Sequence, residues 1–169
     1  MKKKLFTIWM VLLISMLATS PVYAGGVSVK WGSGSIIAEG YAFGFSKDAV
    51  SITLHAEGIP HVSCLDPGNG NVVPGQNPVT VEGNTSANLA VQFDENGKFA
   101  IKLEAQPDVQ FLSPVQLGCP NNNWTARVDW VNWYYATITV TENSTGKTLW
   151  FKAYNCTSTP TTVDCKAIK

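Results

Sequence analysis

Apolar and polar residues alternate along most of the chain, a pattern that predicts β-strands. In the clearest run, residues 50–57, the apolar positions Val50, Ile52, Leu54 and Ala56 are separated by Ser, Thr, His and Glu. Successive side chains of a strand point to opposite faces, so this strand has one buried and one exposed face. Beyond the first two dozen residues no stretch carries apolar residues at helical spacing. The chain is therefore predicted to be all-β.

Two hairpins are predicted from turn residues between alternating segments. The first joins Leu89, Val91 and Phe93 to Phe99, Ile101 and Leu103 through residues 94–97, whose Asn-Gly pair suits the positive φ of a tight turn. The second joins residues 136–140 to residues 149–153 through residues 143–146, which are Asn-Ser-Thr-Gly.

Two long stretches between the strands, residues 66–78 and 106–123, contain too much Pro and Gly for strand interiors. About eight strands with frequent turn signals are typical of a two-sheet antiparallel sandwich. A closed barrel is the alternative fold.

The first 24 residues predict a signal peptide. Lys2, Lys3 and Lys4 precede an apolar run, residues 5–17, and Val22-Tyr23-Ala24 forms a small-x-small cleavage site. The apolar run is shorter than the roughly 20 residues that span a bilayer. We expect cleavage after Ala24 and a secreted or envelope-associated protein, residues 25–169, with one domain and no transmembrane segment.

Charge argues against two classes of partner. Without the three leader lysines, nine of the twelve Lys and Arg remain against twelve Asp and Glu, a net charge of minus three. Nucleic acid and anionic membranes attract basic surfaces, so neither is an expected partner.

Four cysteines in an exported chain predict two disulfides. Three pairings are open. Cys156 and Cys165 flank a short segment with a turn-forming proline, Pro160, so the economical choice joins them and leaves Cys64 with Cys119. A zinc site is disfavoured, because the chain has no C-x-x-C pair and both histidines precede Cys64.

Five aromatic residues fall within residues 124–135, directly after three consecutive asparagines. One hypothesis is a platform on which a sugar ring or an apolar partner stacks, with amide groups bonding hydroxyls. Its candidate binding residues are Trp130, Trp133, Tyr134, Tyr135, Asn121 and Asn122.

The competing and favoured interpretation is that these rings fill the sandwich core. Strict alternation would place Trp124, Val128 and Trp130 on one face, up to a bend at Asn132. The same two interpretations apply to Trp31 and Trp150, and to Tyr41, Phe43 and Phe45, whose small neighbours would leave the opposite strand face bare for another sheet or subunit.

No catalytic, metal or cofactor constellation is recognisable. The two histidines, His55 and His61, are expected on a strand surface and in the following turn, and no nucleophile motif accompanies them. Twelve scattered carboxylates offer no identifiable pair for glycoside hydrolysis. We therefore expect no cofactor, no metal and no enzymatic activity.

Two segments carry a family resemblance: residues 62–78, VSCLDPGNGNVVPGQNP, and residues 119–126, CPNNNWTA, continuing to Val140. They resemble a group of small secreted bacterial proteins to which no activity is assigned. The resemblance covers about half of the chain after the leader. It implies an immunoglobulin-like sandwich and a Cys64–Cys119 bridge, and it carries over no catalytic residue.

The sequence thus predicts a secreted, non-enzymatic module that binds polysaccharide or a protein partner through its long loops and aromatic segment. A self-assembling envelope protein is the first alternative, suggested by low charge and many β-branched residues. A secreted hydrolase is the second.

Overall fold

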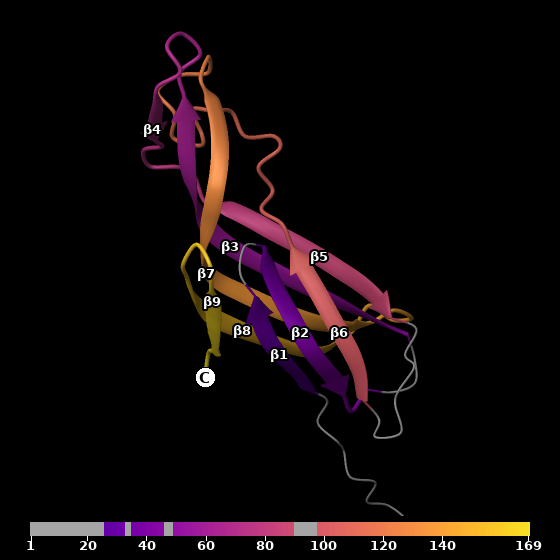
Figure 1. Ribbon diagram of the computed structural model, residues 1–169. Coiled ribbons are helices and arrows are strands. Elements are labelled where there is room, and N and C mark those ends of the chain that lie inside the picture. Colours follow the sequence, from indigo (N-terminus) through magenta and orange to yellow (C-terminus); the bar gives the residue numbers. More distant parts are fainter. Residues whose placement is uncertain (1–25, 33–34, 46–48, 90–97) are drawn as a thin grey trace, which may run out of the picture.

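The computed structural model describes residues 26–32, 35–45, 49–89 and 98–169, which form strands and no helix (Figure 1). The predicted leader and the turn at residues 94–97 lie outside the described residues. In chain order the strands are β1 (Gly26–Gly32), β2 (Ile36–Phe43), β3 (Val50–Leu65), β4 (Val72–Pro74), β5 (Val81–Leu89), β6 (Lys98–Ala105), β7 (Thr125–Glu142), β8 (Thr148–Ser158) and β9 (Val163–Ala167).

These strands form two antiparallel sheets. One sheet has three strands in the order β1-β2-β6. The other has the order β4-β3-β7-β8-β9, and β5 also pairs with β3. The predicted all-β fold with two antiparallel sheets and two disulfides is confirmed.

The main core lies between the sheets, and strand alternation selects its members. In β3 the predicted inward positions, Val50, Ile52, Leu54 and Ala56, are all fully buried. Facing them from the smaller sheet are Ile36, Phe99 and other apolar residues of β2 and β6. Each Ile or Leu buried here stabilises the fold by about 1.5–3 kcal/mol relative to an exposed position.

The hairpin of β7 and β8 forms as predicted. Val140 pairs with Trp150, and the Glu142 N–H donates to the Lys147 carbonyl at 2.9 Å. Gly146 supplies the turn's positive φ of 70°.

The other predicted hairpin is wrong in its described part. Residues up to Leu89 belong to β5 and pair with β3, whereas Phe99, Ile101 and Leu103 belong to β6 and pair with β2. The two consecutive strands therefore contribute to different sheets. Alternation shows which side chains face the core, but not which strand lies alongside.

Beyond the sandwich, the long strands β3 and β7 continue side by side and form, with β4 and two loops, an extension that we call the arm (Figure 1). The arm comprises residues 59–78 and 106–132. It has its own small core of Val62, Cys64, Leu117 and Cys119, flanked by Trp124, Val128 and others. The arm is thus stabilised by its own apolar cluster.

Both disulfides have the predicted pairing. Cys64–Cys119 joins β3 to the end of the second long loop across 55 residues of sequence, which brings both long loops into the arm. Cys156–Cys165 joins β8 to β9 at directly paired positions.

One edge of the arm has no partner strand among the described residues. β7 pairs with β3 through residues 125–133, but its pairing with β8 begins only at Tyr135. Within the described residues, no strand pairs with the other side of β7 at residues 125–131.

Candidate functional site

The outer surface of the six-stranded sheet, on the side away from the core, gathers aromatic side chains from the arm to the sandwich. His61 of β3 and Trp130, Tyr134 and Tyr135 of β7 lie there, and we call these four residues the aromatic face. All four are exposed or half-buried, so none of them fills the core.

Trp130 reaches this face because of a β-bulge. The register between β3 and β7 shifts between His61 and Val62, so that Asp129 is the extra residue and Trp130 pairs with His61. The indole and imidazole rings stack with their centroids 3.9 Å apart and their planes within 7°. The prediction that Trp130 shares a face with Trp124 and Val128 is therefore wrong, because an inserted residue reverses the alternation.

A second bulge places Tyr134 beside Tyr135. The register shifts between Glu57 and Gly58, so that Glu57 pairs with Tyr135 and Gly58 with Trp133. Tyr134, 38% exposed, donates its hydroxyl to Glu57 Oε2 at 3.1 Å. The two bulges therefore bring three of the five clustered aromatic rings to the surface.

A line of polar contacts continues from Tyr134 across the sheet to β5. His55 Nε2 lies 3.4 Å from Glu57 Oε1, and its Nδ1–H donates to Asn84 Oδ1 at 2.7 Å. His55 and Asn84 are directly paired in register, so the backbone holds them together. These contacts order the polar side chains next to the aromatic face.

Trp133 does not belong to the candidate surface, because it is fully buried in the main core. Two glycines make room for its indole. A Cβ atom at Gly58 would stand 2.9 Å from Trp133 Cε3, and one at Gly83 would stand 2.9 Å from Cη2. For this one of the five rings, the core interpretation is the right one.

Asn121 and Asn122 lie in the exposed turn before β7 at the end of the arm. The side chain of Asn121 accepts the Asn123 N–H at 2.9 Å and so stabilises that turn. Trp130 lies five positions after Thr125, the first residue of β7, which is about 16 Å at the usual rise of a strand. The structure therefore does not bring these asparagines to the aromatic face.

The remaining aromatic candidates divide between surface and core. Tyr41 and Phe43 are 54% and 39% exposed, and the small Ala42 between them is the buried residue. The core interpretation is wrong for these two rings. The side chain that faces the core is the small Ala42, which lets the two sheets approach each other. Trp150 and Phe45 pack against the main core and Trp124 against the arm's core, while the side chain of Trp31 lies outside the described part.

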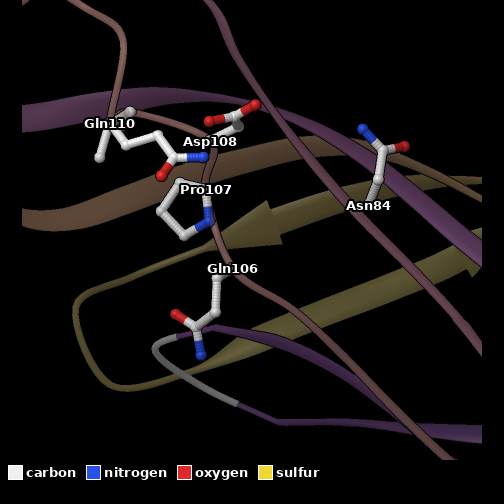
Figure 2. Close-up of a pocket in the computed structure, with 6 residues that line it drawn as sticks. Asn84, Gln106, Pro107, Asp108 and Gln110 are labelled. Carbon is white, nitrogen blue, oxygen red and sulfur yellow. The ribbon is translucent and has the colours of Figure 1, made fainter.

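A polar hollow of about 390 Å³ lies beside β5, next to Asn84. Figure 2 shows Asn84 on one side of it and Gln106, Pro107, Asp108 and Gln110 following one another on the other. The Asp108 N–H donates to the Glu82 carbonyl at 2.7 Å, which ties this segment to β5. The sequence places residues 106–110 in a long loop that is expected to bind a ligand, but it does not single out these side chains. Asn84 is not among the candidate binding residues predicted from the sequence.

Two ionisable groups in the described residues have shifted pKa values. A hydrogen bond from Ser63 lowers the pKa of Asp129, and the Arg127 guanidinium, whose Nε donates to Asp129 Oδ1 at 2.8 Å, adds to the effect. Burial raises the pKa of Tyr154 in the main core. Arg127 and Asp129 therefore form an ion pair on β7 next to Trp130.

The two histidines do not converge. His55 contacts Glu57 and Asn84, whereas His61 stacks on Trp130 six residues along the same strand, about 20 Å away at the usual strand rise. Across the described ranges, no group of three or more His, Cys, Asp or Glu residues is arranged to hold a metal ion. Among the same residues there is no helix that could cross a membrane.

Comparison with known proteins identifies no relative: no protein family, curated protein or solved structure matches the chain. The resemblance to small secreted bacterial proteins stays a prediction.

Proposed function

We propose that the chain is a secreted, non-enzymatic, immunoglobulin-like module of the cell exterior that binds polysaccharide through its aromatic face. Export is proposed on the leader of residues 1–24. The two disulfides support it, since such bonds persist in oxidising compartments.

The observation that carries the proposal is the parallel stack of Trp130 on His61, next to Tyr134 and Tyr135. Flat aromatic surfaces suit the C–H faces of pyranose rings, as they suit other flat apolar ligands. These rings are not needed to fill the core, so a role at the surface accounts for their exposure.

Polar groups beside the rings support the same ligand class. Glu57 accepts the Tyr134 hydroxyl, and the remaining lone pairs of its carboxylate can accept hydroxyl groups at the rim of a stacked sugar. Arg127, three residues before Trp130 on β7, is paired with Asp129. This combination favours an uncharged polysaccharide over an acidic one.

Retention of the intact, oxidised protein on insoluble cellulose, xylan, chitin and mannan tests the proposal. Trp130→Ala should lower the affinity at least tenfold, since a central aromatic contact contributes about 2 kcal/mol or more. Tyr41→Ala is the matched control, because it removes an exposed ring from the other sheet. Equal retention of wild type and Trp130→Ala, or retention on none of the four matrices, would refute the proposal.

Self-association is a second candidate function, favoured by the exposure of Tyr41 and Phe43 on the outer side of the three-stranded sheet. Sedimentation velocity over a hundredfold range of concentration tests it. A larger species that Tyr41→Ala abolishes would support it, and a monomer throughout would exclude it.

A further inference from the structure

The hollow beside β5 has the chemistry of a sugar subsite. Its lining combines three carboxamides, from Asn84, Gln106 and Gln110, with the carboxylate of Asp108. A sugar hydroxyl both donates and accepts hydrogen bonds, so it needs donors and acceptors close together. The described lining residues include no Lys or Arg, and the carboxylate of Asp108 would repel a phosphate, sulfate or uronate group.

For two of these side chains, the contacts they already make determine which hydrogen-bonding group is left for a ligand. Gln106 Nε2 donates to Glu104 Oε1 at 2.8 Å, which leaves the Gln106 carbonyl as an acceptor. Asn84 Oδ1 accepts from His55, which leaves the Asn84 amide as a donor. His55 is therefore a positioning residue for Asn84.

The hollow is connected to the aromatic face. The contacts from Tyr134 through Glu57 and His55 to Asn84 cross from β7 over β3 to β5. Two strand spacings amount to about 10 Å, which a short stretch of polysaccharide spans.

We propose that the hollow is a subsite for one neutral hexopyranose unit of the polysaccharide that stacks on the aromatic face, bonded through Asn84, Asp108 and Gln110. The inference rests on the proposed function and adds two things to it. The ligand chain crosses the strands, and selectivity among sugars arises at β5.

Side-chain amide resonances test the subsite apart from matrix binding. The probes are methyl β-D-glucopyranoside, methyl β-D-galactopyranoside and methyl α-D-mannopyranoside, each titrated into ¹⁵N-labelled protein. At least one should shift the amides of Asn84 and Gln110 saturably, in wild type and in Trp130→Ala alike. Asp108→Asn should weaken that binding about tenfold, as expected for losing a hydrogen bond to a charged group.

The control is Asp164→Asn, which removes an exposed carboxylate from β9, at the opposite edge of the sheet. His55→Ala should also weaken binding of the glycoside. His55→Gln should restore binding, because its amide can still donate to Asn84 Oδ1. A purely structural role of His55 would not be rescued in this way.

The outcomes separate the two proposals. Matrix retention that depends on Trp130, without amide shifts for any of the three glycosides, keeps the proposed function and overturns the subsite. Equal glycoside affinity in wild type and Asp108→Asn also overturns it. Amide shifts without matrix retention keep the hollow as a sugar site and overturn the aromatic face.

Discussion

The fit of Trp133 against two glycines predicts that these positions are energetically coupled. In Gly83→Ala, the added methyl would stand 2.9 Å from Trp133 Cη2 and 3.0 Å from the Gln106 carbonyl oxygen. Overpacking of this kind costs about 1–3 kcal/mol. The smaller entropy of the unfolded alanine chain offsets about 0.4–1 kcal/mol of that cost. We expect Gly83→Ala to lower the free energy of unfolding by about 1–2 kcal/mol, within these ranges.

A double-mutant cycle identifies the indole as the cause. Trp133→Phe removes the Cη2 atom, so Gly83→Ala should cost about 1 kcal/mol less in that background, a coupling typical of residues in contact. Urea unfolding followed by far-ultraviolet circular dichroism gives the four free energies. Gly68→Ala, in an exposed loop, should stay within about 0.5 kcal/mol of wild type. If the costs of the two single substitutions add up to that of the double substitution within about 0.3 kcal/mol, the reasoning is refuted.

Three further predictions concern the disulfides and the two shifted pKa values. On the chain-entropy model, Cys64→Ser with Cys119→Ser should lower the free energy of unfolding by about 4 kcal/mol. Loss of the other disulfide, which closes a shorter loop, should lower it by about 2.6 kcal/mol, and equal losses in denaturant titrations would contradict this. Ser63→Ala should raise the pKa of Asp129 toward the ordinary 3.8, measured by carboxyl ¹³C NMR. Because folding lowers the pKa of Asp129, its carboxylate stabilises the fold at pH values above its ordinary pKa. This contribution is lost as the pH falls through the pKa of the folded protein. Tyr154 should ionise above its ordinary 10.0 in ultraviolet titration, so stability should decline as the pH rises beyond that value, and an unshifted phenol would contradict its burial.

Strand alternation predicted much of the fold because burial imposes it. The inward positions of β3 and the β7–β8 hairpin follow directly from period-2 spacing and turn residues. The partner of β5 could not be read in this way, since β5 and β6 would satisfy the same alternation as one hairpin or in two sheets. Pairing across distant segments depends on the packing of the whole domain.

The candidate site was predicted only in part, for a local reason. Two bulges in β7 determine which aromatic rings reach the surface. A prediction from strict alternation does not show where an extra residue is inserted. Trp130, Tyr134 and Tyr135 lie at the surface, whereas Trp133, which was named with them as a candidate, is fully buried. The hollow at β5 depends on a loop that returns from β6, and no local pattern reveals such a return.

The side of β7 that has no described partner strand in the arm also bears on aggregation. An unpaired strand edge is a template on which another chain can add, and flat apolar edges grow into fibrils. Here the edge is interrupted by the bulge at Asp129 and carries the charges of Arg127 and Asp129. A misaligned neighbour would have to bury that ion pair and follow an irregular backbone. The same bulge that brings Trp130 to the outer surface thereby discourages fibrillar growth of the protein on itself.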